Sequence, residues 1–453
     1  MSTQVVPLVG NGTPEGGHGR PARRRLACIG GCLLLACGLY VYLRSDRGDS
    51  ADGLPLPLSA KSPYPPVPAG NYTAPDGMGL VQVQFILRHG ARYPAAGEMN
   101  SFERLYSKLR RHVPPSWLDP DLITGDKAWD LSESGRQETA RIARRIVGRY
   151  PALLSSGGPG MRSLRFVSSD FARTVATAAV FRATVDADNE TPPVATIPRA
   201  NDTILAIKYT CPRWAVARLQ EKANLPEEYA VFDAMHGKDL RDRVSRRLGI
   251  DADMITVNDV HKMYALCGYN MALYGKDTHW CTLLDRQTTE LMELRNDIEY
   301  TRIYGRYGGE LNRHVACSLA TSVFQDIDSA LRDPAAATSV FRFGHAETLL
   351  FLTTLLGADR ALGAVDPPIT GGMGAKDSKR RGFKSSVLIP FSSNWGLELY
   401  RDQHAQAYFR LLLNERPVRL PGCDDVLCPL PVLRGMLGAD LGCNYAELCK
   451  TSE

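Results

Sequence analysis

Apolar and polar positions in two parts of the chain predict strands that alternate with helices. Residues 80–87 are apolar and then alternating, which predicts a strand, whereas apolar positions recur at helical spacing through 134–150. The same patterns predict, in chain order, a strand at 164–169, a helix at 174–182, a strand at 339–344, a helix at 346–356, and strands at 386–391, 396–400 and 407–413. Strands that alternate with helices form a sheet covered on both faces, so we expect an α/β fold.

Residues 200–335 differ in pattern from the parts on either side. They carry long charged stretches with helical periodicity, such as 227–248 and 288–300, and few strand signals. We therefore expect a mostly α-helical cap, inserted into an α/β core formed by residues 80–199 and 336–449. Ligands of such sheets bind outside the carboxyl ends of the strands, so the cap is expected over that edge.

A segment of 18 residues without a charge, 26–43, lies near the N-terminus. As a helix it would be about 27 Å long, which is enough to span a thin bilayer. Four arginines and one glutamate precede it, whereas the charges just after it balance. Because positive flanks stay on the cytosolic side, residues 1–25 are predicted to be a disordered cytosolic tail and the rest of the chain to be luminal.

A cleaved signal peptide is the alternative interpretation of residues 26–43. The apolar stretch of a signal peptide usually runs about 7–15 residues, and no clear A-x-A cleavage site is present here. We therefore expect an uncleaved signal-anchor of a single-pass type II membrane protein of the ER or Golgi, with a secreted or cell-surface protein as the alternative. The Pro-rich residues 44–79 are expected to form a semi-rigid stem that packs no core, so the folded part should begin near Leu80.

The composition is that of an ordinary globular protein, with 453 residues of which 44% are hydrophobic and 23% charged. This composition excludes a wholly disordered or fibrous chain. The net charge is +5, of which +3 lies in residues 1–25 (four arginines minus Glu15). So mild a balance gives no reason to expect a nucleic-acid partner.

The eleven cysteines divide by expected compartment. Three lie in residues 26–43, and the other eight permit up to four luminal disulfides, whose pairing does not follow from the residues alone. These eight are Cys211, Cys267, Cys281, Cys317, Cys423, Cys428, Cys443 and Cys449. Sequons at Asn71, Asn189 and Asn201 agree with a luminal glycoprotein.

The first segment with chemical character is RHGARYP, residues 88–94, which follows the first predicted strand. A neutral imidazole such as that of His89 is a competent nucleophile toward phosphorus when the phosphate is held and its charge is screened. Arg88 and Arg92 suit both tasks, because guanidinium groups match phosphate oxygens and stay charged. The alternative is a packed histidine at a strand end beside two solvated arginines.

Two further segments leave predicted strands at the same edge. Arg173, in SSDFART (168–174), lies in the first turn of a helix, where backbone amides favour anions, although an arginine there is usually an ordinary surface residue. In GHAE (344–347), His345 can donate to a phosphate oxygen, and a protonated Glu347 can give its proton to the departing alcohol. An ordinary helix acid beside a packed histidine is the alternative for this segment alone. The conjunction of three such segments favours a phosphate site.

Together, RHGARYP, SSDFART and GHAE resemble the histidine phosphatase superfamily, in particular its histidine acid phosphatase and phytase branch. Most of that branch carries His-Asp in the third segment. The His-Ala-Glu found here is similar to the multiple inositol polyphosphate phosphatases, as are Ala265-Leu266-Cys267 and Trp280-Cys281. The resemblance covers about residues 80–449.

The resemblance implies a phosphoglycerate-mutase-like α/β core with a helical cap, and a reaction without a metal or other cofactor. It implies that His89 is the phosphorylated nucleophile and Glu347 the proton donor. The phosphate pocket would consist of Arg88, Arg92, Arg173 and His345. It further implies a disulfide between Cys267 and Cys281.

The resemblance also implies the substrates: phytate, lower inositol polyphosphates and 2,3-bisphosphoglycerate. A polyanion needs basic residues beyond this phosphate pocket. The candidates are Arg110, Arg111, Lys208 and the basic run 376–384. The run 376–384 fits a solvated surface loop equally well. An acid phosphatase for another luminal phosphomonoester, such as a phosphosugar or a phosphoprotein, is the alternative enzyme. A non-catalytic glycoprotein that binds polyanions is the alternative of another class.

Overall fold

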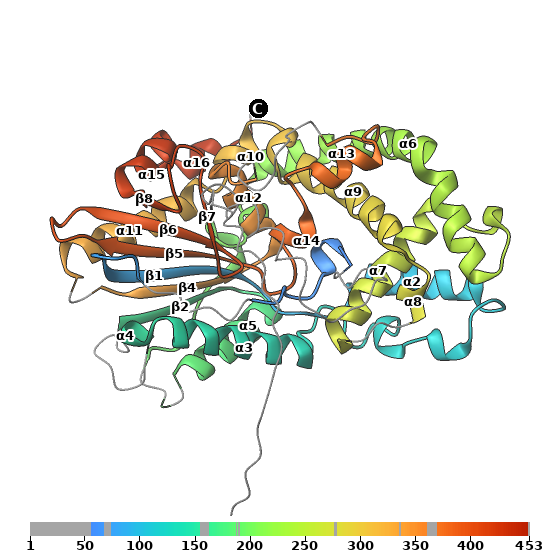
Figure 1. Ribbon diagram of the computed structural model, residues 1–453, viewed down its shortest axis with the longest axis horizontal. Coiled ribbons are helices and arrows are strands. Elements are labelled where there is room, and N and C mark those ends of the chain that lie inside the picture. Colours follow the sequence, from blue (N-terminus) through green and yellow to red (C-terminus); the bar gives the residue numbers. More distant parts are fainter. Residues whose placement is uncertain are drawn as a thin grey trace, which may run out of the picture. The chain divides into compact units, whose positions relative to one another are not determined.

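Eight strands of the described chain form one mixed sheet in the computed structural model (Figure 1). The structure describes residues 56–67, 74–154, 163–186, 188, 191–275, 279–334, 337–359 and 369–451. The strands run in the order β3-β2-β4-β1-β5-β6-β7, with β8 paired to β6. Their bounds are β1 Gly79–Arg88, β2 Leu164–Ser169, β3 Ala195–Ile197, β4 Ser339–Gly344, β5 Asn394–Arg401, β6 Ala407–Leu413, β7 Arg416–Val418 and β8 Leu427–Pro429. The strands β3, β2, β4 and β1 are parallel, and β5 pairs antiparallel with β1.

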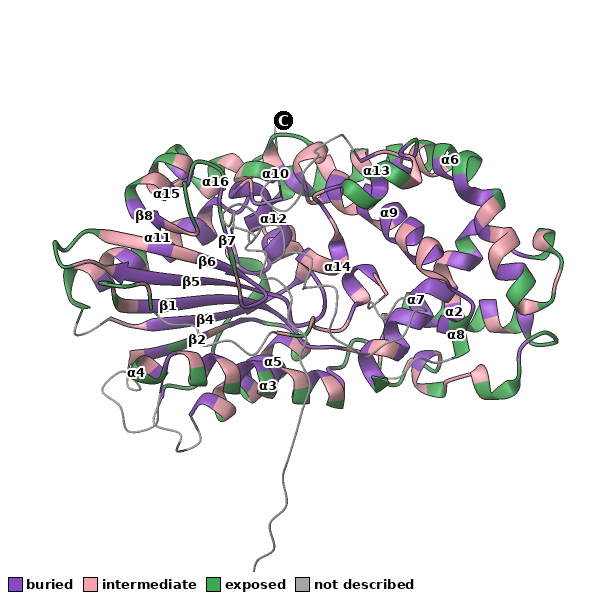
Figure 2. Ribbon diagram, viewed as in Figure 1, coloured by how far each residue is buried: buried purple, intermediate pink, exposed green. Residues whose placement is uncertain are grey.

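Helices cover both faces of this sheet, as the alternating pattern predicts (Figure 1). On one face lie α3 (Glu133–Arg149) and α5 (Ala172–Val185), and on the other lie α11 (Cys317–Arg332), α12 (Ala346–Leu355) and α15 (Leu430–Leu437). Side chains alternate along β1, so that Phe85 packs toward α3 and α5 while Ile86 belongs to the core of the opposite face. The strands β1, β4 and β5 are buried along most of their length (Figure 2).

A second group of helices lies beyond one end of the sheet (Figure 1). It consists of α2 (Ala96–Leu109), α6 (Pro212–Leu248), α7 (Val257–Tyr274), α8 (His279–Thr282) and α9 (Arg286–Ile303). Short helices complete the described chain: α4 (Pro151–Leu154), α10 (Leu311–His314), α13 (Ala375–Arg380), α14 (Ser385–Leu388) and α16 (Tyr445–Leu448). The helical character expected for 200–335 is present, although α11, which falls in that range, packs against β1 instead of extending this second group.

One predicted strand is a helix. Residues 386–388 belong to the short helix α14, residues 389–391 follow it outside any strand, and the first N–H groups of the helix are bound by carboxylates. Ser385 N donates to Asp297 Oδ1 at 3.1 Å and Ser386 N to Glu293 Oε1 at 2.8 Å. Because these buried acceptors come from α9, far away in sequence, the apolar pattern of 386–391 alone pointed to the wrong element.

The expected stem is also partly wrong, because residues 56–67 are packed into the fold. Leu58 and Ala60 are only 1% and 5% exposed; Leu58 precedes a short 3-10 helix, η1 (Ser59–Lys61), and Ala60 lies within it. The backbone carbonyl of Pro57 accepts from Tyr264 at 2.9 Å, and Tyr64 OH donates to Glu415 Oε1 at 2.9 Å. The folded part therefore starts by residue 56 and not near Leu80.

Four disulfides join the eight cysteines outside residues 26–43: Cys211–Cys449, Cys267–Cys281, Cys317–Cys443 and Cys423–Cys428. The Cys267–Cys281 bond, implied by the resemblance, ties α7 to α8. Cys211–Cys449 ties the start of α6 to the residue after α16.

Several sequence predictions fall on residues outside the described part of the chain: the segment 26–43, Asn71 and Asn189. Asn201 is described and is exposed in a short 3-10 helix. Within the ranges that the structure describes, no helix combines the length and the apolar character needed to cross a bilayer.

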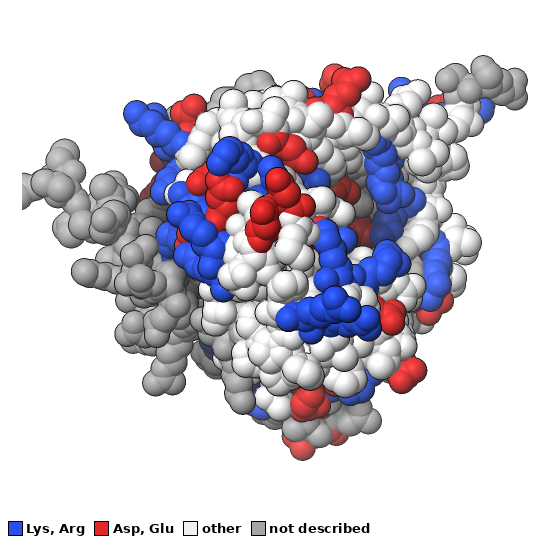
Figure 3. All heavy atoms as spheres, turned by 90° about the vertical axis from the view of Figure 1, so that its right-hand side faces the viewer, with Lys and Arg blue, Asp and Glu red and all other residues white. Residues whose placement is uncertain are grey.

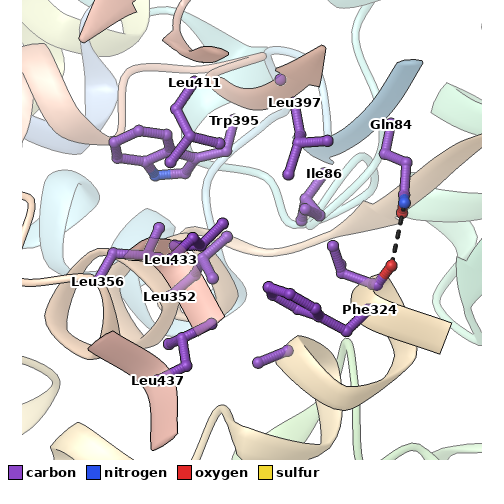
Figure 4. A pocket seen from close by; sticks show the side chains of 13 residues that line it. Gln84, Ile86, Phe324, Leu352, Leu356, Trp395, Leu397, Leu411, Leu433 and Leu437 are labelled. Carbon is purple, nitrogen blue, oxygen red and sulfur yellow. Dashed lines mark hydrogen bonds between the residues drawn. The ribbon is translucent and has the colours of Figure 1, made fainter. Parts of the chain in front are cut away.

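A small apolar cavity of about 40 Å³ lies between the sheet and the helices α11, α12 and α15 (Figure 4). Its one amide, that of Gln84, donates to the backbone oxygen of Val323 at 3.1 Å and to Gln82 Oε1 at 2.8 Å. With its polar group satisfied and its other walls aliphatic or aromatic, this cavity is a gap in core packing and not a site of chemistry.

Candidate active site

The three segments singled out from the sequence meet at the carboxyl ends of β1, β2 and β4. Arg88, the last residue of β1, is in register with Gly344, the last residue of β4, and Ser168 of β2 pairs with Phe343. The histidines that follow β1 and β4 are therefore neighbours, and the ring centroids of His89 and His345 lie 5.8 Å apart. Parallel strands bring their carboxyl ends to one edge, which explains why distant segments converge here.

His89 is buried and held as a neutral imidazole. Its backbone N–H continues the β1–β4 pairing by donating to Gly344 O at 3.1 Å, and its Nδ1 lies 2.9 Å from Gly90 O. Because a carbonyl oxygen only accepts, Nδ1 carries the proton and Nε2 keeps its lone pair. Burial and the charge of Arg88 hold the pKa of His89 well below its usual range. The side chain thus has the form that a nucleophile requires.

Gly90 allows this turn to lie directly against the start of α3. A Cβ placed there would be 2.7 Å from the backbone oxygen of Gly135. The close approach fixes the loop that carries Arg92 against α3.

Arg88 is anchored by backbone carbonyls from segments distant in sequence. Its Nη1 donates to Ala60 O at 2.6 Å and to Ile389 O, and its guanidinium group lies 4.5 Å from the ring centre of Phe391. Burial lowers the pKa of Arg88 to about 10, so the group stays charged at neutral pH. The segment that was expected to be a stem therefore supplies one of the two carbonyls that orient this arginine.

Arg92 and Arg173 both contact the indole of Trp129. The guanidinium group of Arg92 is 4.4 Å and that of Arg173 5.1 Å from the ring of Trp129. Arg92 also donates to Tyr93 O at 2.6 Å. Burial lowers the pKa of Arg173 to about 10. Two like charges are thus held side by side, with cation–π contacts offsetting part of their repulsion.

His345 is bound by protein groups at both ring nitrogens. Its Nδ1 accepts from Arg173 Nη2 at 3.1 Å, and its Nε2 lies 3.2 Å from Ser169 Oγ. Burial, with Arg173 nearby, lowers the pKa of His345 to about 3, which agrees with a neutral ring that accepts at Nδ1. In this structure His345 orients Arg173, and the direct contact with phosphate predicted for it would require a change of partner.

Glu347, the second residue of α12, forms an ion pair with Lys208 Nζ. Burial by itself would raise the pKa of this carboxyl, but the charge of Lys208 holds it well below its usual range. The side chain that the resemblance makes a proton donor is therefore ionised in this structure.

The comparison with protein families agrees with the arrangement of these residues. The model of the histidine phosphatase superfamily (branch 2) matches residues 79–414, which is most of the chain. The chain belongs to this superfamily. It is an enzyme of the histidine acid phosphatase kind, as its motifs predicted.

The similarity to known proteins covers most of the length of this phosphatase. Multiple inositol polyphosphate phosphatase 1 of Gallus gallus is 25% identical over 395 residues, which cover 83% of this chain and 85% of that protein. The phytase of D. castellii has a TM-score of 0.71 at 17% identity and covers 91% of each chain. The multiple inositol polyphosphate phosphatase of Bifidobacterium longum, solved with inositol hexasulfate, has a TM-score of 0.66 at 14% identity and covers 85% of this chain and 98% of that one.

Sequence patterns did not indicate several residues near Arg88, Arg92 and Arg173, which we call the clamp. Trp129 is one, because no motif marks it. Another is Lys61, which was taken for part of the stem and pairs with Glu98 at 3.3 Å. Glu98 in turn accepts from Tyr269 OH at 2.7 Å and lies 4.0 Å from Arg92 Nη1. Side chains of this kind are brought to the site by tertiary packing, which a local pattern does not show.

The basic residues proposed for polyanion binding lie in three different environments. Lys208 lies in the site, paired with Glu347. The run 376–384 is different, because Arg381 is buried and forms ion pairs with Asp297 at 2.7 Å and Glu293 at 3.2 Å. For Arg381 the substrate-binding hypothesis is therefore wrong, since its charge is neutralised inside the protein. Arg110 and Arg111 are exposed just after α2.

Proposed function

We propose that this phosphatase hydrolyses inositol polyphosphates through a phosphohistidine intermediate on His89. One observation supports the proposal above the others. A buried, neutral His89, with its Nε2 free to attack, stands at the same strand edge as Arg88, Arg92 and Arg173. A nucleophile beside fixed positive charges is the arrangement that phosphoryl transfer requires.

In the first step His89 Nε2 attacks phosphorus, a P–N bond forms, and the bond between phosphorus and the ester oxygen of the inositol breaks. Arg88, Arg92 and Arg173 stabilise the charge on the other phosphate oxygens. Protonated Glu347 gives its proton to the departing alkoxide. In the second step water attacks the phosphorus of phospho-His89, Glu347 accepts a proton from that water, and inorganic phosphate leaves with the imidazole restored.

Inositol polyphosphates are proposed as substrates because two kinds of observation agree. The relatives named above include a multiple inositol polyphosphate phosphatase 1, a phytase and a complex with inositol hexasulfate. On the face that shows the second group of helices, Lys and Arg side chains border a hollow in the surface (Figure 3). Phytate, its lower forms and 2,3-bisphosphoglycerate are the first substrates to compare. The reaction is proposed to need no metal.

Glu347→Gln tests the proposed chemistry through the leaving group. Glutamine cannot supply a proton, so we expect kcat on phytate to fall by about 10²–10⁴-fold. With 4-nitrophenyl phosphate, whose leaving group needs no proton, the loss should be less than about tenfold. Steady-state kinetics of the purified full-length protein with both esters measure the difference. Equal losses on the two esters would show that Glu347 is not the acid.

We further propose that the protein is anchored by residues 26–43 in membranes of the secretory pathway, with the phosphatase domain in the lumen; a secreted or cell-surface protein is the alternative. The support is the arginine-flanked apolar segment, the four disulfides and the exposed sequon at Asn201. Expressed in animal cells, the full-length chain is expected to gain mobility in gel electrophoresis when N-glycans are removed. Asn201→Gln should abolish one part of that shift. A chain whose mobility is unaffected by the glycosidase would contradict a luminal domain.

A further inference from the structure

Lys208 is the immediate counter-ion of Glu347. It lies in a 3-10 helix, η6 (Ile207–Tyr209), and its ammonium group contacts Glu347 Oε1. Both side chains are partly accessible, with 23% of Lys208 and 15% of Glu347 exposed. The charge of Glu347 also acts on Arg88, Arg92 and Arg173, so the pair lies near the arginines that are proposed to hold phosphate.

The backbone that carries Lys208 is fixed relative to Glu347. Thr348, the next residue of α12, donates through Oγ1 to Leu205 O at 2.6 Å, and Asp202 Oδ1 accepts from Leu205 N at 2.7 Å. On the other side, the disulfide Cys211–Cys449 holds the end of the segment. With its backbone fixed, Lys208 can change partner only through its flexible four-carbon side chain.

A carboxyl that contacts an ammonium group cannot serve as an acid until that contact is broken. Lys208 keeps Glu347 ionised, and Lys208 is separate from the three arginines proposed to hold the phosphate that is cleaved. In an ester with a single phosphate, that phosphate binds the three arginines, and no second anion is present to bind Lys208. An ester with a second phosphate beside the first presents Lys208 with an alternative anion.

We propose that Lys208 determines specificity by exchanging Glu347 for a second phosphate group next to the one that is cleaved, so that Glu347 takes up the proton it later donates. The proton comes from solvent, and no further covalent step is added. The inference rests on the proposed function, in which Glu347 is the acid. It explains why the acid is kept ionised in the absence of substrate: only esters with neighbouring phosphates activate it.

The surroundings of Lys208 suit such a second phosphate. Its ammonium group lies 4.9 Å from the ring of Tyr209, a side chain that is 52% exposed. Tyr209 packs on Phe171 with 5.3 Å between ring centres, and Arg199 lies 4.1 Å from the ring of Phe171. Asp170 is exposed, and its backbone oxygen accepts from Arg199 Nε at 2.6 Å. Lys208 and Arg199 thus provide two cations on aromatic supports outside the clamp.

The test compares phytate with 2-glycerophosphate, an alkyl ester that carries one phosphate. In Lys208→Met we expect kcat/KM on phytate to fall by about tenfold or more, because a charge-assisted contact to the second phosphate is lost. On 2-glycerophosphate we expect kcat/KM to rise, because Glu347 is no longer held ionised. Lys208→Arg, which keeps the charge, should restore most of the preference for phytate. In Lys208→Met/Glu347→Gln the gain on 2-glycerophosphate should disappear.

Lys262→Met is the matched control, because Lys262 is also about one-fifth exposed (21%) and pairs with a carboxylate, that of Asp259, at 3.2 Å. Its ratio of kcat/KM on the two esters should stay within twofold of wild type. If Lys208→Met does not fold, as judged by its thermal unfolding, Lys208→Gln serves for the same comparison. An unchanged ratio, or equal losses on both esters, overturns the role of Lys208. Wild-type protein that hydrolyses neither ester overturns the proposed function itself.

Discussion

His89→Ala is expected to abolish hydrolysis of every phosphomonoester. The substitution removes the only group that bonds to phosphorus in the proposed first step, and fixed arginines alone cannot replace a nucleophile. We expect kcat on 4-nitrophenyl phosphate to fall by on the order of 10⁴-fold or more. Rapid-quench measurement of the phosphoenzyme in acid-stable and acid-labile fractions would in parallel show whether any phosphohistidine still forms.

A control separates this loss from damage to the fold. His314, on α10, pairs with Asp440 at 2.6 Å and is outside the site. His314→Ala should keep kcat within about twofold of wild type, because surface substitutions have small effects. If His89→Ala retained more than a tenth of the wild-type rate, a phosphohistidine on this residue would be excluded.

Arg381→Ala is expected to lower the free energy of unfolding by about 3–5 kcal/mol, since it leaves two buried carboxylates without their cation. Arg381 donates from Nη2 to Asp297 Oδ2 at 2.7 Å and to Glu293 Oε2 at 3.2 Å. Burial already raises the pKa of Asp297, and Arg381 is the charge that opposes this shift. The two acids also bind the N–H groups at the start of α14, so the damage should extend to that helix.

Urea unfolding, followed by circular dichroism, measures the effect of Arg381→Ala. The exposed neighbour Arg380 provides a matched control. Arg380→Ala should change the free energy of unfolding by less than about 0.5 kcal/mol. A loss below about 1 kcal/mol in Arg381→Ala would mean that the network contributes little. In that case the basic run would have to be reconsidered as a binding surface.

The parts of the site that could be predicted from sequence are those set by strand ends. His89, Arg173 and His345 each follow a predicted strand, and parallel pairing of β1, β4 and β2 brings them together. The identity of these residues then indicates phosphate chemistry, because nucleophile and guanidinium groups are local features of short motifs. Long stretches with helical periodicity likewise predicted the helical character of the region beyond the sheet.

The rest depends on contacts between segments far apart in sequence. Residues 56–67 looked like a spacer because proline content was the only local signal, yet Leu58 is buried and Ala60 O orients Arg88. The apolar pattern of residues 386–391 predicted a strand. The carboxylates that bind the first N–H groups of α14 come from α9, so nothing within the segment indicates the helix. The pairing of Lys208 with Glu347 joins two residues 139 positions apart, and no pattern within either segment indicates it.

Trp129 has a consequence of a practical kind. Trp129 is 45% exposed and has a left-handed backbone conformation (φ 70°). Its indole contacts the guanidinium groups of Arg92 and Arg173. Indole emission responds to nearby charge, and these two charges are the ones that bound phosphate would neutralise. Under the proposed function, the emission of Trp129 is therefore expected to report phosphate binding at Arg92 and Arg173 without a label.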